Sequence, residues 1–96
     1  MKPSVPFQQK RVEVRQIASR FRVANPRVFG SVLHGNDSDG SDLDLLVDPL
    51  PETTLLDLGA LQGALEDLLG IPVDVRTPAG LPLKFRAAVV AEAQPV

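Results

Sequence analysis

The sequence predicts an α/β (α+β) domain in which helices cover a small mixed β-sheet of about three strands. Apolar residues recur at helical spacing in three stretches, short apolar or alternating runs lie between them, and Gly or Pro marks most of the junctions. The chain has 96 residues, which suffice for one hydrophobic core but not for two. We therefore expect a single domain over residues 1–96.

The first third of the chain predicts a helix followed by a strand. From Phe7 to Phe21, apolar residues at positions 7, 14, 17, 18 and 21 are separated by charged ones, which is typical of an amphipathic helix. Asn25-Pro26 is expected to interrupt the chain. The run Arg27-Val28-Phe29 then predicts a first strand, which must stop at Gly30.

The middle of the chain predicts a short helical turn at 31–35, a polar loop at 36–40 and a second strand at 42–47. In this strand, apolar residues alternate with Asp42 and Asp44. The apolar positions are Leu43, Leu45 and Val47.

The last part of the chain predicts two helices and a third strand. Thr54 and Asp57 have capping-box spacing ahead of a leucine-rich helix that ends at Gly70. A strand at 71–76, with Val73 and Val75 on one face and Asp74 on the other, and a helix at 84–93 complete the expected elements.

Two carboxylates set two positions apart are the strongest chemical signal in the chain. Side chains alternate faces along a strand, so Asp42 and Asp44 project to one side with their Cα atoms about 6 to 7 Å apart. Mg²⁺ binds through one or two protein carboxylates, completed by phosphate oxygens and water. If the third strand pairs beside the second, Asp74 joins this face. Three neighbouring acids repel one another unless cations neutralise them, and two metal ions suit an in-line displacement.

Gly30 and Ser31 stand where the first strand gives way to the helical turn. Backbone N–H groups and the Ser31 hydroxyl can face an anion there, and glycine permits close approach. A Gly-Ser pair alone is weak evidence, but the eleven positions from Ser31 to Asp42 (42 − 31) allow the second strand to return beside the first. Together with the carboxylates, the pair predicts a site for a metal-bound nucleotide.

Other interpretations of the acidic segment stay open. Asp37, Asp39, Asp42 and Asp44 could all belong to a solvated turn, although Asp is disfavoured within strands. An EF-hand loop fits less well, because a pattern that starts at Asp37 puts Asp42 where that loop needs glycine.

Four further side chains have two interpretations each. His34, the only histidine, is either solvated or a donor to a phosphate oxygen. Phe21 and Phe29 are interpreted as core residues rather than base-stacking ones. Arg76, two positions after Asp74, is interpreted as a strand-edge charge, with a phosphate contact as the alternative.

Composition and charge exclude several classes of protein. Cysteine is absent, which excludes disulfides, thiolate zinc sites and cysteine nucleophiles. The net charge of −2 argues against nucleic acid as a direct partner. The first third is basic and the middle acidic, which gives either two solvated faces or a contact surface for an acidic partner or nucleotide phosphates. No apolar run approaches the roughly 20 residues that span a bilayer and no signal peptide is evident, so we expect no membrane association and a cytoplasmic location.

The strings GSVLHG and SDLDLLV, with VDV later in the chain, resemble the minimal nucleotidyltransferases of the DNA polymerase β superfamily. These proteins share G-S-x-x-x-G, then x-D-x-D, then a third carboxylate on a later strand, and the resemblance covers nearly the whole chain. It implies the nucleotidyltransferase fold. It further implies that the triphosphate is held by Gly30 and Ser31, with Ser41 also in nucleotide binding, and that two Mg²⁺ ions are held by Asp42, Asp44 and Asp74. Asp74 is implied as a ligand or as the base for the attacking hydroxyl.

The resemblance also implies an activity and a partner. Many minimal members are similar to antitoxins that transfer AMP from ATP to a tyrosine of a helical HEPN ribonuclease toxin. The chain has no tyrosine, so such an acceptor must lie on the partner. One departure is that many relatives carry Arg before the second Gly of the turn motif, where this chain has His34. Two alternatives stay open: an antitoxin that neutralises by binding alone, and a transferase subunit for a small hydroxylated molecule such as an aminoglycoside.

Overall fold

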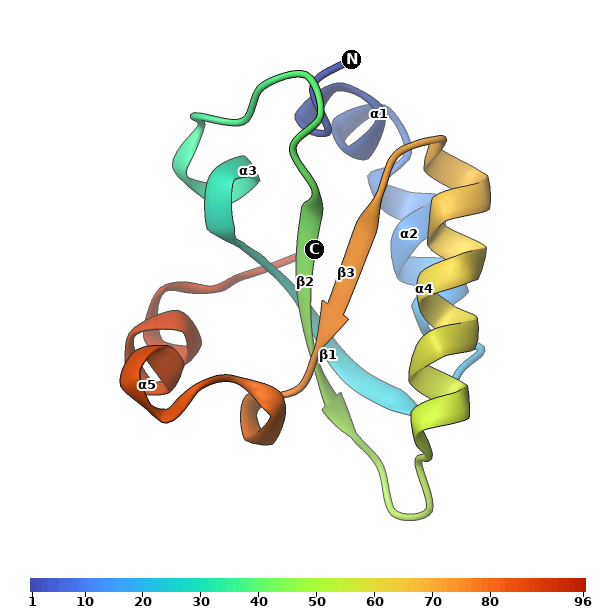
Figure 1. Ribbon diagram of the computed structural model, residues 1–96. Coiled ribbons are helices and arrows are strands. Elements are labelled where there is room, and N and C mark those ends of the chain that lie inside the picture. Colours follow the sequence, from blue (N-terminus) through green and yellow to red (C-terminus); the bar gives the residue numbers. More distant parts are fainter.

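The computed structural model describes residues 1–96 as a four-stranded mixed sheet with helices on both faces (Figure 1). The strands are β1 (Val23–Phe29), β2 (Leu43–Pro49), β3 (Val73–Arg76) and β4 (Gln94–Pro95), in the order β3-β2-β1-β4. β1 pairs antiparallel with β2 and β4, whereas β2 pairs parallel with β3. The α+β class is confirmed, with one strand more than expected.

Five α-helices and one 3₁₀ helix accompany the sheet. They are α1 (Ser4–Gln9), α2 (Arg11–Ala18), α3 (Gly30–His34), α4 (Leu55–Leu69), η1 (Pro78–Gly80) and α5 (Leu83–Glu92). Figure 1 shows α2 and α4 on one side of the strands and α5 on the other. No helix combines the length and apolar character needed to cross a membrane.

The hydrophobic core lies between the sheet and helices α2 and α4. Leu43 and Leu45 of β2 are almost completely buried there, as are Leu61 and Leu65 of α4 and Val14 of α2. Because side chains alternate along a strand, the residues between the core positions of β2 and β3 face the opposite side. That opposite face carries the acidic residues.

The single helix expected from Phe7 to Phe21 is wrong, because Lys10 separates α1 from α2. Its backbone angles, φ −118° and ψ 26°, are not helical. Its Nζ donates to the carbonyl oxygen of Leu68 at 3.0 Å, near the C-terminal end of α4, where unpaired carbonyls attract cations. The helical spacing of the apolar residues continues through the break, so the sequence pattern does not reveal that the helix is interrupted at Lys10.

β1 is longer than expected, because it runs through Asn25-Pro26 instead of starting after them. The register with β2 shifts between Ala24 and Arg27, and Asn25 has a positive φ of 58°. This irregularity accommodates Pro26, which has no N–H to donate to a neighbouring strand.

β4, which was not predicted, is only two residues long and depends on contacts from distant parts of the chain. Arg11 Nη2 donates to the Pro95 carbonyl at 2.8 Å, and Arg15 Nε donates to the Val96 carbonyl at 3.2 Å. The Val96 N–H donates in turn to the Pro26 carbonyl at 3.1 Å. Two of the basic side chains in the first third of the sequence therefore fasten the end of the sheet.

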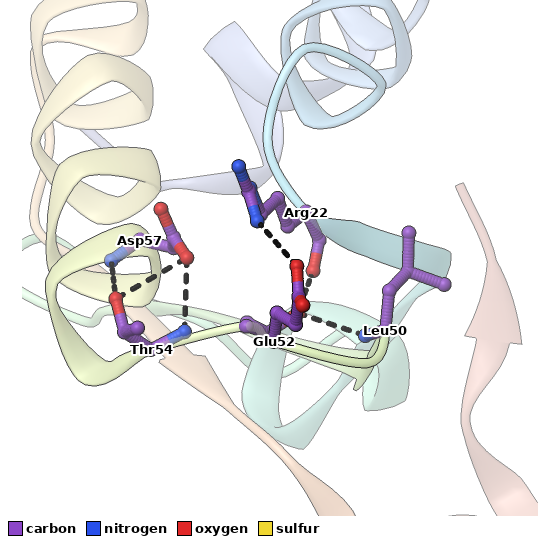
Figure 2. A network of polar contacts seen from close by, with 6 residues as sticks. Arg22, Leu50, Glu52, Thr54 and Asp57 are labelled. Atoms are coloured by element: carbon purple, nitrogen blue, oxygen red, sulfur yellow. Dashed lines mark hydrogen bonds and ion pairs between the residues drawn. The ribbon is translucent and has the colours of Figure 1, made fainter.

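The capping box at the start of α4 is confirmed (Figure 2). The Asp57 N–H donates to Thr54 Oγ1 at 3.2 Å, and the Thr54 N–H donates to Asp57 Oδ2 at 2.9 Å. Arg22 and Glu52 pair at 3.5 Å beside this cap and join the start of β1 to the β2–α4 connection. α4 ends, as predicted, at Gly70.

α4 also provides hydrogen-bond acceptors for β3, the strand at one edge of the sheet. The N–H groups of Val73 and Val75 point away from β2 and donate to Glu66 Oε2 and Gln62 Oε1, each at 3.1 Å. A strand edge covered in this way offers no free donors at these two positions to another chain. The position of β3, and hence of Asp74, is fixed from both sides.

Candidate active site

Asp44 lies in the middle of the sheet, between Phe29 of β1 and Asp74 of β3. It is the registered partner of both residues. Directly paired residues of parallel strands project from the same face, and Asp44 and Asp74 both line one cavity of about 400 Å³. The third strand thus lies beside the second, which is the condition under which Asp74 joins the face of Asp44.

Gly30 joins β1 to α3 and brings the backbone against the Asp44 carboxylate. Its φ is +73°, a conformation that glycine adopts without the steric cost of a side chain. A Cβ atom at this position would overlap Asp44 Oδ2 and lie 3.1 Å from Asp44 Cγ. Glycine is therefore required here both by the backbone angle and by the space that Asp44 occupies.

The Asp44 carboxyl is electrostatically unfavourable in its ionised form. Burial first, and then the charges of Asp74 and Asp42, raise the pKa of Asp44 to about 6, while Arg76 opposes the shift. A cation beside the carboxylates would relieve this repulsion and desolvation. Oxygen donors of this kind fit Mg²⁺, which needs only one or two carboxylates when phosphate oxygens and water complete its coordination.

Arg76 pairs with Asp74 and also lines the cavity. Its Nε donates to both carboxylate oxygens of Asp74, at 3.1 and 3.0 Å. Among the residues that line the cavity it is the only cation. Two acidic side chains and one basic side chain therefore line the cavity.

The cavity also has an apolar wall. It is formed by Leu81 and Pro82 after η1 and by Phe85 and Val89 of α5. Phe29 lines the same cavity and is only partly buried, so its assignment to the core is wrong, whereas Phe21 does pack against the core. The sequence did not reveal this wall. An amphipathic helix is recognised by the periodic spacing of its buried apolar residues, and α5 has no buried residue.

Three of the predicted site residues do not line the cavity. Asp42 is exposed and precedes β2 by one residue, yet its charge acts on Asp44. Ser31 lies in the first turn of α3. Ser41 closes the preceding loop, because its hydroxyl accepts the Ser38 N–H at 3.0 Å. No three acidic, histidine or cysteine side chains form a ready-made metal cluster.

His34 and Asp37 have structural contacts outside the cavity. His34 Nε2 lies 3.1 Å from Glu92 Oε1, which links α3 to the end of α5. Asp37 is buried, not part of a solvated turn, and Oδ2 accepts the Ser4 N–H of α1 at 2.9 Å. This backbone hydrogen bond lowers the pKa of Asp37.

Comparison with known proteins places this geometry in a family. A family model described as nucleotidyltransferase domain matches residues 11–96. The chain is 39% identical over 61 residues to protein adenylyltransferase MntA of Thermococcus cleftensis, covering 64% of this chain and 62% of that protein. It is 36% identical over 61 residues to MJ1217 of Methanocaldococcus jannaschii, provisionally named a protein adenylyltransferase, with the same coverage of 64% and 62%. The chain thus matches less than two thirds of the length of these curated relatives.

Solved structures agree with the fold. One that is provisionally described as a minimal nucleotidyltransferase has a TM-score of 0.86 and 40% identity, over 100% of this chain and 97% of that one. A toxin-antitoxin crystal structure with AMP-PNP has a TM-score of 0.71 and 18% identity, over 91% of this chain and 69% of that one. The second likeness concerns the fold alone.

Proposed function

Because the chain belongs to the nucleotidyltransferase domain family, we propose that it is an enzyme that transfers AMP from ATP to a hydroxyl group of a partner protein. The observation that carries the proposal is the direct pairing of Asp44 with Asp74 beside Gly30, in one cavity. The names of MntA and MJ1217 as protein adenylyltransferases support the choice of reaction.

In this proposal, the chain's own residues bind and orient the substrates. Gly30 lets the nucleotide approach the backbone, and the Ser31 hydroxyl donates to a phosphate oxygen, with Ser41 at the rim. Asp42, Asp44 and Asp74 would hold two Mg²⁺ ions, with phosphate oxygens as further ligands. When bound, these ions neutralise the polyphosphate and favour in-line displacement.

The reaction itself exchanges one bond to the α-phosphorus for another. The acceptor hydroxyl oxygen forms a bond to the α-phosphorus, the bond from that phosphorus to the oxygen bridging to the β-phosphate breaks, and pyrophosphate leaves. The hydroxyl proton passes to a carboxylate, for which Asp74 is the candidate, and from there to solvent. Most of the catalytic task is positioning, which two adjacent strands can provide.

The proposed acceptor is a tyrosine of a HEPN-type ribonuclease toxin that this chain, as a single domain of residues 1–96 in the cytoplasm, inactivates as an antitoxin. The chain has no tyrosine of its own, so the acceptor must come from a partner. The likeness in fold to a toxin-antitoxin structure with AMP-PNP is compatible with this pairing.

Labelled ATP tests the proposal directly. With Mg²⁺ and a candidate toxin, label at the α-phosphate should enter the partner, whereas label at the γ-phosphate should leave as pyrophosphate. Asp44→Asn should abolish the transfer, while Asp67→Asn, on the exposed side of α4, should not. A partner that binds the chain yet stays unlabelled would reject the activity, and label on an added aminoglycoside would redirect it to a small acceptor.

A second candidate function is neutralisation of the partner by binding alone. It is favoured by Leu55 and Leu56 at the start of α4, each 85% exposed, because exposed leucines are suited to an apolar contact. Cells that carry the toxin distinguish the two functions. If Asp44→Asn protects them as well as the unmodified chain does, binding explains the neutralisation and AMP transfer does not.

A further inference from the structure

Arg76 occupies a position from which it can reach a substrate. It follows Asp74 by two residues on β3, so both side chains project from the same face of the sheet. Its side chain is 45% exposed and lines the cavity that Asp44 and Gly30 also line. Unlike an arginine enclosed by protein, it remains accessible to a molecule in the cavity.

The hydrogen bonds of Arg76 leave most of its donors free. Arginine carries five N–H donors, and in Arg76 the single Nε donor makes both contacts to Asp74. The two terminal Nη groups have no hydrogen-bond partner in the structure. By contrast, Arg86 of α5 uses Nη2 for the carbonyls of Ala79 and Leu81 at 3.0 and 2.9 Å. The Arg76 guanidinium is therefore held by Asp74 through Nε, while its two Nη groups are unpaired.

Arg76 is the only positively charged side chain in the cavity that could bind a phosphate group. His34, the candidate phosphate donor of the turn motif, is outside the cavity, and its Nε2 lies 3.1 Å from Glu92 Oε1. A polyphosphate would enter a cavity lined by two carboxylates and only one cation. A guanidinium matches phosphate oxygens with two parallel hydrogen bonds, which a lysine ammonium does not.

We propose that Arg76 binds the polyphosphate of the nucleotide through its Nη groups while its Nε keeps Asp74 oriented. This inference rests on the proposed function, because it names a further substrate-binding residue of the same site. It replaces the interpretation of Arg76 as a strand-edge charge. One side chain thereby links the acidic residues to the anionic substrate.

Binding of a non-hydrolysable ATP analogue with Mg²⁺ tests the assignment, for example by calorimetry. Arg76→Gln should weaken binding about 10- to 100-fold, as expected for loss of charged hydrogen bonds. Arg76→Lys, which keeps the charge, should recover part of the loss. Arg20→Gln, an exposed arginine outside the cavity, removes the same charge and should change the Kd less than twofold. Far-UV circular dichroism confirms that each variant is folded.

A double-mutant cycle separates phosphate binding from mere positioning of Asp74. If Arg76 touches the phosphates, Arg76→Gln should weaken binding by a similar factor in an Asp74→Asn background. If its effect vanishes there, or if Arg76→Gln binds as tightly as the unmodified chain, the inference is overturned although the enzyme stands. An unmodified chain that binds no ATP analogue would instead refute the proposed function and the inference together.

Discussion

Replacing Asp44 with Asn should stabilise the fold at neutral pH while it removes the proposed activity. In the unfolded chain the carboxyl ionises near the usual pKa of 3.8, whereas in the folded protein burial and the neighbouring acids raise the pKa to about 6. Between these two values the folded state holds a proton that the unfolded state has lost. The free energy of unfolding therefore falls as the pH rises through this range.

The size of this effect follows from the two pKa values. One pKa unit corresponds to about 1.36 kcal/mol, so the full shift would amount to about 3 kcal/mol. Because the side chain is still partly exposed to water, screening reduces the expected cost of the ionised form to about 1 to 2 kcal/mol. Asn has nearly the same shape and carries no charge, so Asp44→Asn should gain this amount at pH 7 and nothing below about pH 4.

Urea unfolding at several pH values measures the difference. The chain has no tryptophan or tyrosine, so far-UV circular dichroism is the suitable probe. The gain should also appear as a rise in Tm of about 4 to 8 °C for each kcal/mol. Asp67→Asn, an exposed acid on α4, should follow the pH profile of the unmodified chain. If the stability difference of Asp44→Asn is the same at pH 4 and pH 7, or if the variant is less stable at pH 7, the electrostatic reasoning is refuted.

Three other substitutions test the contacts that position the site. Gly30→Ala should abolish transfer and destabilise the fold by at least about 1 to 2 kcal/mol in urea unfolding, because the new Cβ meets Asp44 at a positive φ; near-normal activity would show that the close approach is dispensable. Gln62→Ala should cost about 1 kcal/mol, since it leaves the Val75 N–H without its acceptor, and faster amide exchange at Val75 checks the cause. Thr54→Ala should cost about 1 kcal/mol through loss of the helix cap, whereas Thr54→Ser should restore most of it.

The elements predicted well are those whose signals lie within a few residues of each other. Thr54 and Asp57 define the start of α4 through contacts three positions apart. The alternation of acidic and apolar residues in β2 defines both the strand and the face that Asp44 occupies. These local patterns, together with the family resemblance, were enough to predict the fold class and the acidic residues of the site, whereas the direct pairing of Asp44 with Asp74 is seen only in the structure.

The features that were missed depend on contacts between distant residues. The break occurs at Lys10, whose side chain bonds to Leu68, 58 positions away. β4 is held by the side chains of two arginines that lie more than 80 positions earlier in the chain. The apolar wall of the cavity has no periodicity to reveal it, because Phe85 and its neighbours are placed by the connection after β3 and not by burial of one helix face.

The register of β2 couples the core to the site, and this coupling explains how the sheet tolerates an unfavourable acid. Leu43 and Leu45 are buried on one face, and burial of each such side chain contributes about 1.5 to 3 kcal/mol. A slip of one residue would move both leucines out of this core and also turn Asp44 away from Asp74 and Gly30. The two leucines therefore outweigh the 1 to 2 kcal/mol or so that the ionised Asp44 costs. β2 can therefore keep an electrostatically unfavourable carboxylate at the cavity, because burial of the leucines on its other face fixes the register of the strand.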